Sequence, residues 1–256
     1  MSGLADRRRN LGPIDFQRID IPSLDSDELT NNQGNATQPR PVFVRQGVAA
    51  QNSGSCYLEV GDIKIMATVN GPLQLRGEFQ SQAEIEVSVN IQEFSGVEHK
   101  EETSKSIAEF VKSCITPAII LEEIPKSLIQ VSIRILSGTV GSAQKCASVN
   151  ASIMALINAG IVLHDMVTAV SVVQKDEQFF VDVDVNENSE NVNQLLVAYK
   201  PATKKIVSFQ IMSAQAVSKE SIEALLSHAE PACLHLRNAF ASYLLEDYVK
   251  ESSKSE

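Results

Sequence analysis

The stretch NSGSCYLEVGDIKIMATVNGP, residues 52–72, shows the pattern on which the fold is built. Apolar residues alternate with other residues on both sides of the pair Gly61–Asp62. The apolar positions are Cys56, Leu58 and Val60 before the pair and Ile63, Ile65 and Ala67 after it. A period of two is typical of a β-strand with one buried face, and Gly-Asp suits a two-residue turn. We therefore predict a β-hairpin over 56–67.

Two more strands and two helices follow this hairpin. Residues 84–91 (EIEVSVNI) and 129–135 (IQVSIRI) repeat the alternation with a period of two. Between them, apolar residues recur at the spacing of one helical face, and two polar residues before that face are candidate helix caps. The apolar residues are Ile107, Phe110, Val111, Cys114 and Ile115, and the candidate caps are Thr103 and Ser104. Residues 147–159 are apolar around most of a helical circumference and precede Gly160, which predicts a buried helix with a glycine just past its end.

The C-terminal half repeats the order of strands followed by a helix. Strands are expected around 167–173, 180–185, 194–199 and 206–211, and a helical stretch is expected over 218–248. Pro231 is expected to kink or split that helix. We therefore predict an α+β protein with two similar sheet-plus-helix subdomains. Their expected bounds are 41–164 and 165–249, with an arm over 1–40 and a polar tail over 250–256.

Composition excludes several classes of protein. The 256 residues are 43% hydrophobic, which is enough for a packed core, and the formal net charge of -10 argues against a chain that holds nucleic acid alone. The four cysteines form no CxxC pair, so a reducing compartment is expected and no structural metal is implied. The chain contains neither a secretory signal nor an apolar run of ~20 residues, so we expect a soluble, intracellular protein that contacts no membrane.

Four stretches together resemble the RNase PH fold family: residues 52–72, ETSKSIAEFVKS at 102–113, GSAQKCASVNASIMALINAGI at 141–161, and VDVDVNEN at 181–188. The opening ADRRRNLGP and the segment GPLQLRGEFQSQ at 71–82 are most similar to RNase PH-like ring subunits of the eukaryotic RNA exosome, of the mRNA-transport-regulator type. The resemblance implies the RNase PH fold and a ring of six such subunits, arranged as three heterodimers, around an RNA channel.

The same resemblance implies which molecules the chain meets. The expected partners are the other RNase PH-like ring subunits, the exosome cap subunits, an associated nuclease, and RNA that passes through the assembled channel. No cofactor is expected. The implied locations are the nucleus, the nucleolus and the cytoplasm.

Active members of this family use inorganic phosphate to attack the 3′-terminal phosphodiester of RNA and release a nucleoside diphosphate. Their phosphate loop, similar to Gly-Gly-Thr-Arg, corresponds to Ser142, Ala143, Gln144 and Lys145 here. A lysine in place of the arginine loses the planar, bidentate guanidinium clamp. Gly141, Ser142 and Lys145 could still bind an anion weakly, or this could be an ordinary helix N-terminus.

The catalytic carboxylates of active relatives follow a pattern similar to DLDxEED and then Asp-Met. The last carboxylate of that pattern falls on Asn188, and the aspartate of the pair falls on Gln194 or, with a shift of one residue, on Asn193. These amides cannot supply the charge that metal binding or proton transfer needs. Asp182 and Asp184 remain on one face of a predicted strand, where a solvated strand face explains them without catalysis.

Active relatives also carry a row of arginines on the helix that corresponds to 102–113. Here the exposed face offers Lys105, Glu109 and Lys112, and we expect the first two to form a surface ion pair. Arg76 is expected on a loop, either facing the RNA entrance of the ring or as an ordinary surface or intersubunit arginine. The candidate RNA-binding residues are therefore Arg76, Lys105, Lys112 and Lys145, and no catalytic or metal-binding residue is expected.

Together these residues predict a non-catalytic structural subunit that completes the ring and supports 3′-to-5′ RNA processing by an associated nuclease. The alternative is a phosphorolytic 3′-exoribonuclease that uses Asp182, Asp184 and Lys145. A free-standing RNA-binding module is a third reading, which the acidic balance disfavours. The run Arg7–Arg9 is either a localisation or nucleic-acid-binding patch or part of a solvated arm.

Overall fold

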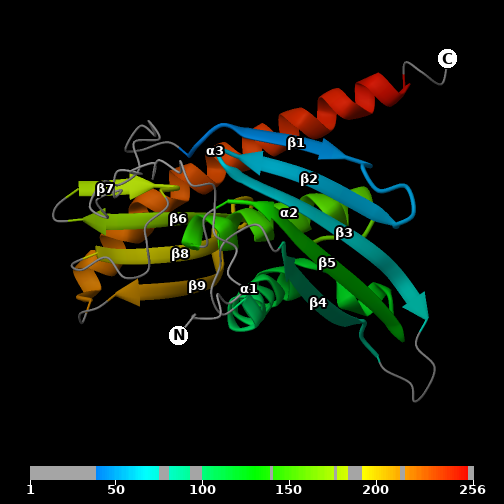
Figure 1. The fold of residues 1–256 in the computed structure, drawn as a ribbon, viewed down its shortest axis with the longest axis horizontal. Helices are drawn as coiled ribbons and strands as arrows, with labels where there is room; N and C mark the ends of the chain where they lie inside the picture. Colours follow the sequence, from blue (N-terminus) through cyan, green and yellow to red (C-terminus); the bar gives the residue numbers. More distant parts are fainter. Residues whose placement is uncertain are drawn as a thin grey trace, which may run out of the picture.

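The computed structural model describes residues 39–74, 81–92, 100–138, 141–175, 178–183, 192–213 and 217–252. These residues form two β-sheets that lie side by side, with helices packed on them (Figure 1). The α+β class predicted from the sequence is confirmed. The expected arm lies outside the described residues except for Pro39 and Arg40.

The first sheet has five strands in the order β1-β2-β3-β5-β4. Their bounds are β1 Val42–Gln46, β2 Gly54–Val60, β3 Ile63–Gln74, β4 Glu84–Ile91 and β5 Ser127–Ser137. Strands β2 and β3 pair antiparallel with Val60 opposite Ile63, so the predicted hairpin is confirmed. Gly61 has the positive φ, 56°, that a tight hairpin turn requires. The apolar side chains of this hairpin point to the core, and Leu58 and Ile65 are completely buried.

Two helices cover the inner face of the first sheet: α1, Lys100–Ile115, and α2, Ser142–Asn158. Two short 3-10 helices, η2 (Thr116–Ala118) and η3 (Leu121–Glu123), follow α1. All five apolar residues predicted for one face of α1 are buried. The predicted caps Thr103 and Ser104 are wrong, because both lie inside the helix. Glu101 and Glu102 occupy the first turn instead, where negative charge is favourable next to the positive end of the helix dipole.

The central helix of the fold is α2, which packs on β2 and β3, on α1, and on the second sheet. It begins at Ser142, earlier than the start at 147 that apolar periodicity predicts, and its first turn is buried as fully as the apolar part. It ends as predicted, with Gly160 at a φ of 71° just past the last turn. Its end lies so close to β2 that a Cβ on Gly54 would lie 2.4 Å from the amide nitrogen of Ala159.

The second sheet has four strands in the order β7-β6-β8-β9. Their bounds are β6 Thr168–Lys175, β7 Gln178–Val181, β8 Val192–Lys200 and β9 Lys205–Ser213. The four predicted strands are present, but β7 ends at Val181, before the predicted end at 185. Asn150 of α2 ties this sheet to the central helix, because its side-chain amide exchanges two hydrogen bonds, of 2.8 and 2.9 Å, with the backbone of Ala169.

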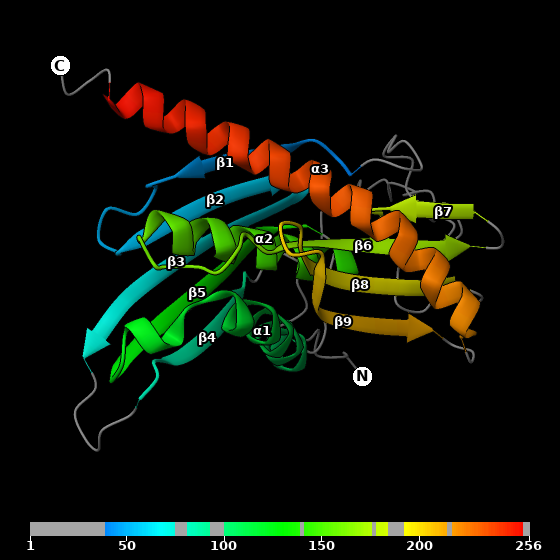
Figure 2. The ribbon, with the colours of Figure 1, turned by 180° about the vertical axis from the view of Figure 1, so that it is seen from behind.

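The last helix, α3 (Lys219–Ser252), crosses the second sheet on the face opposite α2 and continues past the edge of β1 (Figure 2). Pro231 does not split it, and the helix continues through the start of the predicted polar tail. Pro231 is exposed, so water can solvate the carbonyl that the proline leaves without a donor. Near its end, the hydroxyl of Tyr243 accepts a hydrogen bond of 3.0 Å from the Gln46 amide of β1. Among the described residues, none of the helices has the length and apolar character of a membrane span.

Candidate functional site

The first turn of α2 is the centre of the candidate site, because the sequence resemblance predicts the phosphate loop of active relatives at these residues. Gly141 precedes it with extended backbone, and no side chain caps the helix. Ser142 and Gln144 are completely buried, and Lys145 is 5% exposed. The first amides of a helix have no partner within the helix, so this end carries partial positive charge.

Gln194 of β8 faces this first turn. Its side chain is 4% exposed, and its amide nitrogen donates a hydrogen bond to the hydroxyl of Ser142. Gln194 is one of the two positions onto which the aspartate of the Asp-Met pair falls in active relatives. An amide that donates to a hydroxyl brings no negative charge, so it cannot balance a metal ion or take a proton at neutral pH.

Asp182 directly follows β7 and has a positive φ of 58°. Its carboxylate accepts hydrogen bonds from the Arg40 side chain, at 3.1 Å from Nε and 3.2 Å from Nη2, and a third of 3.1 Å from the Arg40 amide. The two side chains are 9% and 13% exposed. The prediction that Asp182 lies on a solvated strand face is therefore wrong: the strand ends one residue earlier, and a guanidinium from the other end of the chain covers the carboxylate.

The charges of Asp182 and Lys145 both act on Cys146, the residue that follows Lys145 in α2. Burial raises the pKa of the Cys146 thiol well above its usual value, the charge of Asp182 raises it further, and the charge of Lys145 lowers it. Two of the three residues of the catalytic alternative, Asp182 and Lys145, therefore lie close enough to Cys146 to influence its thiol. The third, Asp184, lies outside the described residues, and so does the candidate RNA-binding residue Arg76.

Lys105 and Lys112 lie on the exposed face of α1, as expected. The predicted ion pair of Lys105 with Glu109 is wrong: it is absent from the ion pairs of the described residues. Both side chains are exposed, where such a pair gains little and costs rotamer freedom. Lys112 lines a groove of about 340 Å³ together with Glu84, Glu86 and Glu109. Its surroundings are therefore acidic, in contrast to the arginine row of active relatives.

The side-chain amide of Gln144 is buried in the first turn of α2 with its hydrogen-bonding groups unused by the described residues. Neither its side-chain nitrogen nor its oxygen has a hydrogen-bond partner among the described residues. Weak anion binding at this turn therefore stays a prediction. Within the same described ranges, no three His, Cys, Asp or Glu side chains come together in a way that could hold a metal ion.

Arg40 is the residue of this site that sequence reasoning missed. It stands between two prolines in a stretch that reads as a polar arm, and it is 142 residues away from Asp182. No periodic pattern links positions so far apart. The resemblance to active relatives pointed to Asp182 but gave no indication of its partner.

The sequence of the chain is similar to known exoribonuclease and exosome proteins. Residues 38–162 match the family model described as 3′ exoribonuclease family, domain 1 (RNase_PH). The exosome complex component Rrp41 of Pyrococcus horikoshii is 31% identical over 193 residues, which cover 73% of this chain and 76% of that protein. The chain belongs to the RNase PH family. The exosome complex component Rrp41 of Nitrosopumilus maritimus is 28% identical over 181 residues, which cover 68% of this chain and 73% of that protein.

Solved structures have the same RNase PH fold. Rice Rrp46 superposes with a TM-score of 0.69 at 18% identity, over 83% of this chain and 98% of that one. A chain of the Archaeoglobus fulgidus exosome with RNA bound to the active site also gives a TM-score of 0.69 at 18% identity, over 81% of this chain and 91% of its own. At this identity the structural likeness concerns the fold alone, and it confirms the predicted RNase PH fold.

Proposed function

We propose that this chain is a non-catalytic structural subunit of an RNA exosome core ring, of the mRNA-transport-regulator type. Relatives named as exosome components, together with the fold of exosome core chains, support membership of the ring. One observation carries the non-catalytic role: the Gln194 amide donates to Ser142 at the buried start of α2, at one of the two positions that match an active-site aspartate.

The bond between Gln194 and Ser142 has a structural purpose. It joins β8 to the first turn of α2, and both side chains are at least 96% buried. A buried polar group without a partner costs roughly 1–3 kcal/mol, so this pairing stabilises the contact between helix and sheet. In an active enzyme the same location needs a negative charge that a metal or a proton can use.

The ion pair of Arg40 and Asp182 supports the same role. A guanidinium that donates two hydrogen bonds to one carboxylate neutralises the charge that a metal ion would otherwise use. Asp182 thereby joins Arg40, two residues before β1, to the end of β7, that is, the first sheet to the second. In this role the carboxylate contributes to stability instead of chemistry.

As a ring subunit, the chain would work through its neighbours. The outer edges of β4 and β9 have no partner strand among the described residues, and such edges suit contacts with other subunits. The proposed partners are other RNase PH-like subunits, cap subunits and an associated nuclease that degrades RNA from the 3′ end in the nucleus, nucleolus and cytoplasm. Arg76 and Lys105 would contact passing RNA, and Lys112 and Lys145 would contribute less, because one lies among carboxylates and the other is buried.

A phosphorolysis assay tests this proposal. The full chain, alone and co-purified with its ring neighbours, is incubated with 3′-labelled RNA and phosphate, and nucleoside diphosphates are measured, with an archaeal exosome as the positive control. We expect no phosphate-dependent release from the chain alone and, in the assembly, no change on Asp182→Asn or Lys145→Met. Release that requires phosphate and disappears in either variant, while the variant stays folded, would establish the enzymatic alternative.

A further inference from the structure

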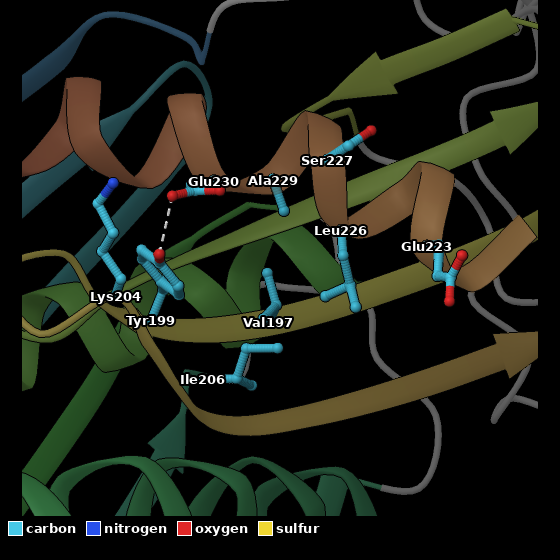
Figure 3. Close-up of a pocket in the computed structure, with 9 residues that line it drawn as sticks. All are labelled: Val197, Tyr199, Lys204, Ile206, Glu223, Leu226, Ser227, Ala229 and Glu230. Atoms are coloured by element: carbon cyan, nitrogen blue, oxygen red, sulfur yellow. Dashed lines mark hydrogen bonds between the residues drawn. The ribbon is translucent and has the colours of Figure 1, made fainter. Parts of the chain in front are cut away.

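A groove of about 350 Å³ lies between α3 and the second sheet, on the face opposite α2 (Figure 3). Its apolar lining is Val197, Ile206, Leu226 and Ala229, and its polar lining is Tyr199, Lys204, Glu223, Ser227 and Glu230. None of these residues belongs to the site around the first turn of α2. The groove is therefore a separate feature of the surface.

The groove exists because one helix is too narrow for this sheet. Four strands about 4.8 Å apart make a face of roughly 15–20 Å, whereas a helix with its side chains covers about 10 Å. The α3 helix packs on β6, β7 and β8 and leaves the β9 side open. Ile206 is 46% exposed there and Phe209 is 58% exposed. Phe209 pairs with Val197, so both side chains lie on the face of the sheet that α3 only partly covers.

The α3 wall of this groove is acidic. Glu223 and Glu230 are two turns apart and both line it, and Glu230 accepts a hydrogen bond of 2.9 Å from the Tyr199 hydroxyl (Figure 3). Glu223 pairs with Lys219 at 3.5 Å, but both side chains are more than 60% exposed, so this pair contributes little. Lys204 is the single cation of the lining. The groove therefore suits a segment with apolar side chains next to positive charge.

We propose that the occupant is residues 7–16 of this same chain, RRRNLGPIDF. Three arginines come first and complement the acidic wall of α3. Leu11, Ile14 and Phe16 follow, and these side chains match the uncovered apolar surface around Ile206 and Phe209. Burying one such side chain contributes roughly 1.5–3 kcal/mol, so two or three are enough to hold a tethered segment.

The length of the chain allows this contact. Arg40 is held by Asp182 next to the end of β7, at the edge of the sheet opposite β9. Residues 17–39 can span about 75 Å when extended, at about 3.3 Å per residue. The path across four strands and along β9 is shorter, roughly 35–50 Å. A tethered segment also has a high effective concentration, so modest contacts are sufficient.

Site-specific photocrosslinking of the full chain tests this proposal. The photoreactive residue p-benzoylphenylalanine replaces Phe209, and adducts are mapped by mass spectrometry after illumination. The matched control carries the same residue at Phe43, which is 56% exposed and belongs to β1 at the edge of the other sheet. We expect intramolecular adducts with residues 7–16 from position 209, at least about fivefold more than from position 43. Equal yields, adducts elsewhere in the chain, or adducts with another polypeptide would overturn the proposal.

A charge exchange distinguishes docking from chance contact. The two substitutions are Glu223→Arg, at an exposed position of α3, and Arg8→Glu, in the arm. Each alone should reduce the yield of the adduct from position 209 by several-fold. The two together should restore it, because the positive and negative charges exchange places and still attract each other. Circular dichroism verifies that each variant is folded. If single variants leave the yield unchanged, or if the double variant does not recover it, the assigned charge contact is wrong. The result does not depend on whether the chain is catalytic.

Discussion

Replacing Arg40 with methionine removes both side-chain hydrogen bonds to Asp182 and keeps the aliphatic volume. The Asp182 side chain is 13% exposed in the intact pair, and of its three donors the variant keeps only the backbone amide of residue 40. Removing one partner of a buried ion pair costs about 3–5 kcal/mol, and the retained amide places the expected loss at the lower end, about 3 kcal/mol. Asp182→Asn keeps one acceptor oxygen, so we expect a smaller loss of about 2 kcal/mol.

The double variant decides whether these losses come from the pair itself. If the pair is the cause, the two losses are not additive, and the coupling free energy should be about 1.5–2.5 kcal/mol. Urea denaturation, followed by circular dichroism, gives the free energy of unfolding of each variant. The control cycle uses Lys64 and Glu59, which pair at 3.5 Å with exposures of 44% and 35% and should couple by less than about 0.5 kcal/mol. A coupling at the first pair no larger than at the second would refute the claim that Arg40 and Asp182 join the two sheets energetically.

Three further variants test other parts of the fold. Gly54→Ala should destabilise the fold by about 3 kcal/mol, because its Cβ would meet the backbone of α2. The control Gly47→Ala, with a φ of 67° and no atom within 4 Å of its Cβ, should cost only about 1 kcal/mol. Thermal unfolding measures both. Gln194→Asp should lose about 2–3 kcal/mol, because it buries a charge and removes the donor to Ser142, without gaining phosphorolysis in the assay described above. Burial raises the pKa of the Cys233 thiol from 9.0 to about 12, so the folded state keeps a proton that the unfolded state loses over this range. Stability should therefore fall between pH 9 and 12, and Cys233→Ala should reduce that fall by up to about 1.4 kcal/mol per pH unit; an unchanged slope in reducing buffer contradicts the assignment.

The parts of the fold that the sequence predicted correctly depend on local periodicity. The hairpin around Gly61 and the apolar face of α1 repeat every two or every three to four residues, so neighbours in sequence reveal them. Helix ends were less predictable: Thr103 resembles a cap, but Glu101 and Glu102 extend the helix N-terminally. Apolar periodicity placed the start of α2 at 147, because the residues of its first turn are polar and their burial depends on tertiary packing; the helix N-terminus at 141–145 was suggested by the family resemblance instead.

The candidate site divides in the same way. The resemblance led to Asp182, Lys145 and Gln194, because motif positions can be counted along the chain. It could not predict that Asp182 is covered by Arg40 or that Gln194 bonds to Ser142, because these contacts join residues 142 and 52 positions apart. Such partners are chosen by the packed fold, and local residue patterns carry no information about them.

The bond between Tyr243 and the Gln46 amide also affects how the chain is made. The strand that contains Gln46 is among the first parts of the fold to leave the ribosome, whereas α3 is among the last. Until α3 emerges, the outer edge of β1 lacks this cover, and the second sheet lacks the helix on one of its faces. Exposed strand edges and apolar faces favour misassembly during synthesis. A chaperone, or a neighbouring subunit made nearby, would therefore be most useful in the interval before the last helix is released.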